Sequence, residues 1–239
     1  MLALLFGSAT CRGAAPAVPR TPSADSLDFP APDRPISTIV APRWTGEGER
    51  DRLGEAARVI ELTGVRAGMT VADVGAGDGY YVARLSPLVG SRGRVLGEDI
   101  MPEYLDLLRR RVERDGLRNV EVITGTADDP MLPARAVDVA LLIHMYHEIT
   151  RPFELLWHLS SSMKPGGTVA VLDQDAATDR HGTPPALLAC ELGALGFVET
   201  GRTRLRDGAY VALFRAPVVP ETPAVVGAQL GARRCAAGR

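Results

Sequence analysis

One short glycine-rich segment constrains the fold of this chain more than any other feature. The apolar residues 71–74 lead directly into Gly75-Ala76-Gly77-Asp78-Gly79, and a helical pattern begins at Tyr80. Glycine lets the backbone approach a ligand closely, and the first turn of a helix offers N–H groups that have no intrahelical partner. The segment therefore predicts the first strand–turn–helix unit of an α/β fold, with a ligand bound at the turn.

Strand and helix patterns alternate from residue 50 to residue 215. The predicted strands are short and mostly apolar, at 69–74, 94–98, 120–124, 137–143, 168–172, 197–203 and 210–215. The predicted helices lie between them, at 50–62, 80–89, 102–115, 153–163 and 185–195. Continuous apolar runs are typical of strands that are covered on both faces. The pattern predicts a Rossmann-like, three-layer α/β/α sandwich around a seven-stranded, mostly parallel sheet that ends in an antiparallel β-hairpin.

The two ends of the chain lack such a pattern. Residues 1–42 contain seven prolines and no hydrophobic periodicity, and residues 217–239 are mainly proline, alanine, valine and glycine. Segments of this composition bury too little apolar surface to fold. We therefore expect a disordered leader at 1–42, a folded domain at 43–216 and a disordered tail at 217–239.

The leader resembles, in part, the signal of a bacterial lipoprotein. Residues 1–6 are apolar, small residues follow, and Cys11 stands where a lipid would be attached. The pattern lacks a positively charged start, its apolar segment is shorter than the roughly 7–15 residues of a signal peptide, and Thr10 is unfavourable before the cysteine. We therefore expect a cytoplasmic protein, with a membrane-anchored lipoprotein or a periplasmic protein as the alternative. Contact with a membrane is expected only if Cys11 is lipidated.

Composition and cysteine spacing exclude several classes of protein. The net charge is −2, and no basic stretch interleaved with aromatic residues indicates a nucleic-acid partner. No apolar run reaches the roughly 20 residues of a membrane-spanning helix. The three cysteines, Cys11, Cys190 and Cys235, are far apart and odd in number. We therefore expect neither a disulfide framework nor a metal site, and we interpret Cys190 as a buried thiol.

The spacing of the glycines and the next acidic residue indicate which class of ligand the turn binds. Asp99 comes twenty residues after Gly79, at the end of the next predicted strand, where a carboxylate accepts hydrogen bonds from ribose hydroxyls. A nicotinamide dinucleotide site needs Gly-x-Gly-x-x-Gly, so that strand and helix pack closely around a pyrophosphate. Here the third glycine comes one residue early and Tyr80 takes its place. The turn disfavours a dinucleotide, and a nicotinamide-dependent reductase stays open only as an alternative.

Four segments, in the expected order, resemble those of the class I S-adenosylmethionine-dependent methyltransferases. They are the first glycine motif at 71–80, the second-strand segment at 97–103, the approach to the fourth strand at 132–139, and the turn before the fifth strand at 163–167. The resemblance covers about residues 47–216. Within that family it is closest to a bacterial group that carries Tyr146-His147-Glu148 and the segment 126–133.

The resemblance implies S-adenosylmethionine as cofactor, together with a role for seven residues. Those expected to bind the cofactor are Asp73, Gly75, Gly77, Gly79, Asp99, Ile100 and Asp128. The glycines would pass against its methionine part and Asp73 would lie near its amine. Asp99 would bind the ribose and Ile100 would flank the adenine. Many relatives place an aspartate at the position of Thr126 to meet the adenine amino group, and Asp128 is the candidate that replaces it here.

Candidate catalytic residues gather just after the fourth predicted strand. His144, Tyr146, His147 and Glu148 should lie at the carboxyl ends of the strands, where open α/β sheets bind ligands. His144 and His147 are the candidates for contact with the substrate or for base catalysis. Each has a structural alternative, in which the imidazole caps a helix or satisfies a buried carbonyl. Because the sulfonium already activates the methyl group, alignment of the acceptor without a base is a further alternative.

The acceptor follows mainly by exclusion. No Pro-Pro-Tyr-type segment after the fourth strand indicates amino-group methylation of adenine or glutamine, and nothing indicates a nucleic acid. A small-molecule acceptor is therefore expected, with a protein or a lipid as the alternative. The competing hypothesis is a non-catalytic, cofactor-binding envelope protein of the same fold. It gains weight if the leader exports the chain, because S-adenosylmethionine is a cytoplasmic metabolite and an exported enzyme would lack it. Neither the acceptor atom nor the oligomeric state follows from the sequence.

Overall fold

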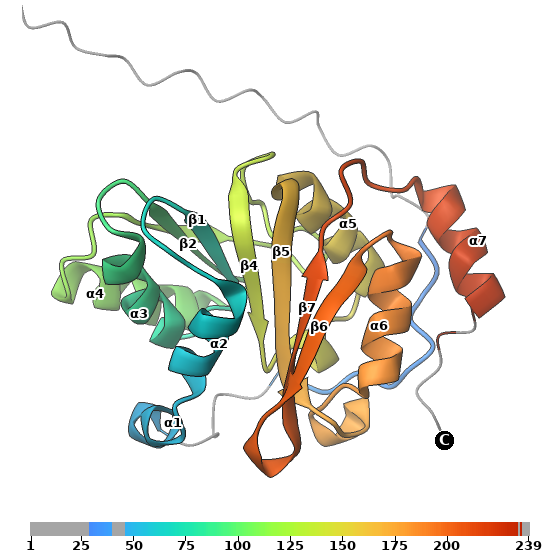
Figure 1. Ribbon diagram of the computed structural model, residues 1–239, viewed down its shortest axis with the longest axis horizontal. Helices are drawn as coiled ribbons and strands as arrows, with labels where there is room; N and C mark the ends of the chain where they lie inside the picture. The colour runs from blue at the N-terminus through green and yellow to red at the C-terminus, as the bar shows by residue number, and fades with distance from the viewer. Residues whose placement is uncertain (1–28, 40–45, 234, 236–239) are drawn as a thin grey trace, which may run out of the picture.

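A seven-stranded sheet runs through the centre of the molecule (Figure 1). The computed structural model describes residues 29–39, 46–233 and 235. The strands are β1 Thr70–Val74, β2 Arg94–Asp99, β3 Val120–Thr124, β4 Val137–Ile143, β5 Met163–Gln174, β6 Val198–Arg204 and β7 Ala209–Arg215. Their order is β3-β2-β1-β4-β5-β7-β6, and β7 runs antiparallel to both of its neighbours. The sheet confirms the fold class, including the antiparallel hairpin at the C-terminal side.

Helices cover both faces of this sheet. They are α1 Glu47–Leu53, α2 Glu55–Thr63, α3 Tyr80–Val89, α4 Pro102–Arg114, α5 Pro152–Ser162, α6 Pro185–Ala194 and α7 Pro223–Arg233, with 3-10 turns η1 Tyr146–Glu148, η2 Thr178–Arg180 and η3 Arg206–Gly208. In Figure 1, α1 to α4 gather to the left of the sheet and α5 to α7 to the right.

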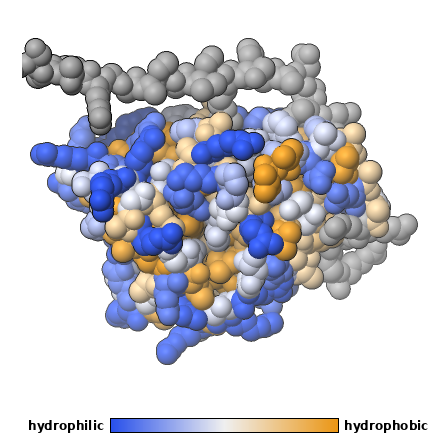
Figure 2. All heavy atoms as spheres, turned by 45° about the horizontal axis from the view of Figure 1, so that its top comes forward, coloured by the Kyte–Doolittle hydropathy of each residue, from blue (hydrophilic) through white to orange (hydrophobic). Residues whose placement is uncertain are grey.

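Alternate residues of the central strands feed two separate apolar cores. In β4, Val139 and Leu141 pack with α2 and α3, whereas Ala140 and Leu142 pack with α5 and α6. All four side chains are buried, because each face of the strand is covered by helices. Figure 2, which turns the top of Figure 1 forward, shows hydrophilic and apolar residues interspersed on the surface above these cores.

The helix expected at 50–62 is divided in two. Gly54 has a φ of 68° and lies between α1 and α2, so the chain turns at this residue. The left-handed conformation favours glycine and ends a helix, which is why α1 and α2 have separate axes. As a result, α1 projects beyond the sheet while α2 packs on it through Ala56 and Val59.

The C-terminal segment differs from the disordered tail expected at 217–239. It contains α7, which packs Val226 and Leu230 into the core beside α6. Beyond it, Cys235 forms a disulfide with Cys190 of α6, across a sequence separation of 45 residues. The expectation of a free buried thiol at Cys190 was therefore wrong. A disulfide between distant residues leaves no local signal in a sequence, and three widely spaced cysteines concealed the pair.

Part of the expected leader also belongs to the folded domain. Residues 29–39 run beside α6 (Figure 1), with Phe29 in the core. The Arg34 guanidinium, fully buried, donates to Glu191 of α6 at 3.0 Å and to the carbonyl oxygens of Tyr146 and Ile149. We call residues 29–39 the N-terminal strap. Cys11 and the remainder of the leader lie outside the described residues, so the expectations about them stay predictions.

Candidate active site

A large cavity opens at the carboxyl ends of β1, β2, β4 and β5. Its volume is ≈ 1160 Å³, and its wall is formed by the loops that follow these strands together with α1, α2 and the strap residue Ile39. Open α/β sheets bind ligands at this edge, where the chain connections turn to opposite faces. The cavity therefore lies where the sequence analysis placed the site.

The glycine loop forms one wall of the cavity. Gly75, Gly77 and Gly79 all have a positive φ, of 72°, 57° and 89°. A Cβ atom on Gly79 would lie 2.6 Å from Leu108 Cδ1, whereas a Cβ on Gly77 would have nothing within 4 Å. Gly79 thus lets α3 and α4 pack together, and Gly77 keeps backbone exposed toward the cavity.

Asp99 supports this loop from the end of β2. Its carboxylate accepts a hydrogen bond from Gly77 N at 2.8 Å and one from Met101 N at 2.9 Å. The residue is 5% exposed and lines the cavity. Because a carboxylate has about four acceptor positions, Asp99 can still accept hydrogen bonds from a ribose. Ile100 follows, 37% exposed on the cavity wall, as expected for a residue that flanks an adenine.

Asp73 is a buried carboxyl group on the cavity wall. Burial raises its pKa to about 7, the charge of Arg50 opposes this rise, and Asp99 and Asp78 add to it. The group therefore titrates near neutral pH. A cation that entered the cavity beside it would favour the charged form, which suits the role expected for Asp73 near the cofactor amine.

Asp128 does not reach the cavity wall. Its carboxylate accepts a hydrogen bond from Thr126 Oγ1 at 2.6 Å and forms an ion pair with Arg151 at 2.7 Å. Thr126 and Ala127 line the cavity instead. The expected adenine contact of Asp128 is thus not supported, because Arg151, which was not considered from the sequence, holds the carboxylate aside.

His144 stands at the end of β4 with a φ of 55°. Its Nε2 lies 3.2 Å from Oε2 of Glu55 on α2, and Glu55 also accepts hydrogen bonds from Arg50 and Tyr81. Burial acts to raise the pKa of Glu55, but His144 and Arg50 outweigh it and lower that pKa to about 2. Glu55 is therefore charged at neutral pH and holds the imidazole of His144 at the cavity wall.

His147 lies in η1, 2% exposed, on the same side of the cavity. Its Nδ1 is 3.1 Å from each carboxylate oxygen of Asp173 on β5. Asp173 is fully buried and also accepts hydrogen bonds from Thr183 Oγ1 at 2.7 Å and Gln174 N at 2.8 Å. The carboxylate favours a proton on Nδ1, which leaves Nε2 of His147 directed to other groups.

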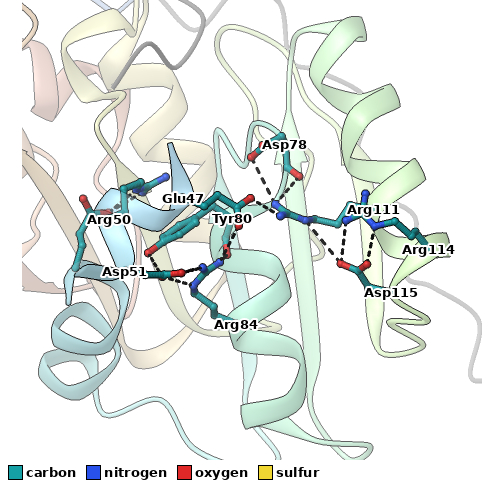
Figure 3. Close-up of polar contacts among 10 residues, drawn as sticks. Glu47, Arg50, Asp51, Asp78, Tyr80, Arg84, Arg111, Arg114 and Asp115 are labelled. Atoms are coloured by element: carbon teal, nitrogen blue, oxygen red, sulfur yellow. Dashed lines mark hydrogen bonds and ion pairs between the residues drawn. The ribbon is translucent and has the colours of Figure 1, made fainter. Parts of the chain in front are cut away.

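Helix α1 is fixed over the glycine loop by a network of charged residues (Figure 3). The ring of Tyr80 lies between the guanidinium groups of Arg50 and Arg84, at 3.8 Å and 3.6 Å from its centroid. Asp51 accepts hydrogen bonds from Arg84 and from the Tyr80 hydroxyl, and Glu47 pairs with Arg111 of α4. This network holds the Arg50 side chain beside the cavity.

The cavity residues that the sequence analysis did not single out include Arg50, Glu55 and His181. Arg50 and Glu55 fall within the helix expected at 50–62, and no local pattern marks His181. Its ring meets that of His147 edge to face, with 5.5 Å between centroids. Three of the four histidines of the chain therefore line one cavity, and this clustering appears only in three dimensions.

Comparison with known proteins shows which family the central part of the chain resembles. A model of the methyltransferase domain matches residues 71–167. A ubiquinone/menaquinone biosynthesis C-methyltransferase of Pseudomonas putida is 32% identical over 122 residues, which are 51% of this chain and 48% of that protein. Residues 71–167 of the chain therefore resemble the methyltransferase-domain family. A protein-L-isoaspartate O-methyltransferase of Pyrococcus horikoshii is 28% identical over 145 residues, 61% of this chain and 57% of that protein.

The chain spans about half the length of the curated relatives it matches. The cofactor of that family is S-adenosylmethionine, as the resemblance of the four segments implied. The individual binding residues of the chain stay predictions, which the geometry supports for Asp73, the three glycines, Asp99 and Ile100.

Solved structures show the same fold. A methyltransferase from Aquifex aeolicus superposes on the chain with a TM-score of 0.65 at 22% identity, over 72% of this chain and all of that one. The [4+2]-cyclase SpnF gives 0.63 at 18% identity, over 79% and 88%. At these identities the likeness concerns the fold. Within the described ranges, none of the helices has the length and apolar character to cross a bilayer.

Proposed function

We propose that this chain transfers the methyl group of S-adenosylmethionine to a small-molecule acceptor. The observation that carries the proposal is that one cavity has two chemically different sides. The cofactor side comprises Asp73, the loop 75–78, Asp99 and Ile100, and the acceptor side comprises His144, His147, Glu148 and His181. At ≈ 1160 Å³ the cavity exceeds the roughly 300–1,000 Å³ typical of a site for one small ligand, so it has room for two.

The cofactor side sets the direction in which the cofactor lies. Asp99 would accept hydrogen bonds from the ribose, Ile100 would flank the adenine, and Asp73 would meet the amine of the methionine part. Bound in this way, S-adenosylmethionine supplies a methyl group that its sulfonium has already activated. The methyl group would then face the segment after β4, where His144 begins the acceptor side.

His144 is the residue best placed to accept a proton from the acceptor. Its Nε2 lies 3.2 Å from Oε2 of Glu55, which holds the ring at the cavity wall. The pair would assist an acceptor that loses a proton during methyl transfer, such as a hydroxyl or a thiol. His147, held by Asp173, would position the acceptor from the other side of the segment.

Turnover of methyl-labelled S-adenosylmethionine tests this proposal. We expect the full chain, mixed with fractions of a bacterial metabolite pool, to form S-adenosylhomocysteine and an equal amount of one labelled small compound. His144→Ala should lower this turnover by about 10²-fold or more, the contribution of a positioned acid–base group, and leave the affinity for S-adenosylhomocysteine intact. His158→Ala is the matched control, because His158 lies on α5 beside Asp129 and outside the cavity wall.

One observation favours the second candidate, a non-catalytic, cofactor-binding protein of the cell envelope. The Cys190–Cys235 disulfide is typical of oxidising compartments rather than of the cytoplasm, where S-adenosylmethionine is made. The likeness to a [4+2]-cyclase adds that this fold is not confined to one reaction. Binding of S-adenosylhomocysteine without turnover in any metabolite fraction would support this candidate and contradict methyl transfer.

A further inference from the structure

Three potential metal ligands meet on the acceptor side of the cavity. His147, Glu148 and His181 each offer one nitrogen or oxygen atom, and these atoms all lie within 4.8 Å of one another. We propose that this trio, the His147–Glu148–His181 cluster, binds a divalent transition-metal ion of the zinc type. The sequence analysis expected no metal site, on the spacing of the cysteines, and no short motif joins these three residues, since His181 follows Glu148 only after 33 residues.

The donor set fits this class of ion and disfavours others. Two imidazole nitrogens and one carboxylate oxygen are a frequent ligand set for catalytic zinc and for non-haem iron(II). Calcium and magnesium prefer ligands that are all oxygen, so two histidines disfavour them. The cluster also lines the cavity, with His147 buried and the other two residues half-buried, so that an ion would have both a firm ligand and access from solution.

A buried carboxylate orients the cluster from behind. Asp173 lies 3.1 Å from Nδ1 of His147, and it is itself fixed by Thr183 and by the backbone N–H of Gln174. A metal-binding histidine usually donates its second N–H to such a carboxylate, which sets the tautomer and aims the other nitrogen at the ion. Nε2 of His147 is aimed in this way at Glu148, whose Oε1 lies 3.9 Å from it.

The strap joins the two loops that carry the ligands. Ser37 N donates to the carbonyl oxygen of His147 at 3.1 Å, and Ser37 Oγ donates to the carbonyl oxygen of Thr178 in η2. The loops after β4 and after β5 are thereby held side by side. Ligand atoms around a tetrahedral zinc ion are on the order of 3.4 Å apart, given metal–nitrogen distances of about 2.1 Å. Small rotations of the half-buried Glu148 and His181 side chains are therefore enough to close the cluster.

Three protein ligands leave a further coordination position open toward the cavity. An oxygen or a sulfur of the acceptor bound there would be held beside the methyl group and would lose its proton more readily. This role in methyl transfer rests on the proposed function. Binding of the ion itself does not rest on it, because binding depends only on the three side chains of the cluster and on Asp173.

Metal titration of the full chain tests the proposal. After removal of bound metal with a chelator, we expect Co²⁺ to bind with one-to-one stoichiometry and to give visible absorption bands, and Zn²⁺ to displace it. Glu148→Gln and His181→Ala should each weaken binding at least tenfold. Asp173→Asn should weaken it by about 10–100-fold, as expected for a residue that acts through His147. His158→Ala, which removes the histidine outside the cavity, should bind like the parent.

Circular dichroism and binding of S-adenosylhomocysteine give the two controls. Glu148→Gln keeps the size of a half-buried side chain, so its spectrum should match that of the parent. The proposal is overturned if the folded parent binds Co²⁺ and Zn²⁺ no more tightly than Glu148→Gln and His181→Ala, or if His158→Ala loses binding equally. Absence of methyl transfer with metal binding intact would instead contradict only the proposed function.

Discussion

The two sides of the cavity are built in different ways. The cofactor side uses backbone conformation and neighbouring residues, since Asp73, the glycine loop and Asp99 come from two adjacent strands. The acceptor side uses side chains from separate loops, which Asp173, Ser37 and distant contacts hold together. The comparison teaches that the proposed cofactor side is built from residues close in the sequence, whereas the proposed acceptor side depends on the tertiary structure.

The largest expected effect concerns the glycine loop. Gly79→Ala combines a positive φ with a Cβ that would lie 2.6 Å from Leu108 Cδ1. We expect a loss of about 2–5 kcal/mol in the free energy of unfolding, from backbone strain and overpacking together. Gly77→Ala, which has a positive φ but open space, should lose only the strain of about 1–2 kcal/mol. Equal losses in chemical denaturation would show that the two glycines do not have separate roles.

Removal of the disulfide tests whether the packing of α7 on α6 relies on a contact between residues that are distant in the sequence. Cys235→Ser removes the link between α7 and α6 and should lower the free energy of unfolding by about 2–4 kcal/mol. The affinity for S-adenosylhomocysteine should hardly change, because the link lies away from the cofactor side. A reducing agent should reproduce the effect in the parent and add nothing in the variant. The account is contradicted if the reducing agent leaves the melting temperature of the parent unchanged.

Asp99→Ala probes the residue that serves both the loop and the expected ribose. We expect S-adenosylhomocysteine to bind about 1–3 kcal/mol more weakly, because hydroxyl groups of the ribose lose their acceptor. The melting temperature should fall as well, since Gly77 N and Met101 N lose theirs. Calorimetry and thermal melting measure the two effects. Unchanged affinity would show that Asp99 supports the loop without touching the cofactor.

Asp73 gives the smallest expected effect, a dependence of cofactor affinity on pH. Its pKa is raised to about 7, so below that pH the carboxyl group must lose a proton before it can pair with the cofactor amine. Affinity for S-adenosylhomocysteine should therefore rise as pH rises, by about tenfold per unit below pH 7, and then level off. Asp73→Asn should bind weakly with a flat profile. A flat profile in the parent as well would place the amine elsewhere.

Much of the fold and the residues of the proposed cofactor side could be predicted from the sequence because both depend on patterns that are local in the chain. Apolar strands and the glycine turn are local patterns, and Asp99 follows from its place at the next strand end. His181 could not be assigned, because its relation to His147 arises from a crossover between two strands. The same holds for Cys235, whose partner is 45 residues away, and for Arg34, whose buried ion pair joins a proline-rich segment to α6. The role expected for Asp128 stays a prediction, and its ion pair with Arg151, 23 residues away, likewise had no local signal.

Calorimetric titration of the full chain with three ligands tests the central claim most directly, namely that the glycine loop, Asp73 and Asp99 bind S-adenosylmethionine. The account predicts micromolar binding of S-adenosylmethionine and S-adenosylhomocysteine, about −8 kcal/mol at a dissociation constant of about 1 μM, and no binding of NADH. Binding of NADH without binding of S-adenosylhomocysteine would contradict it.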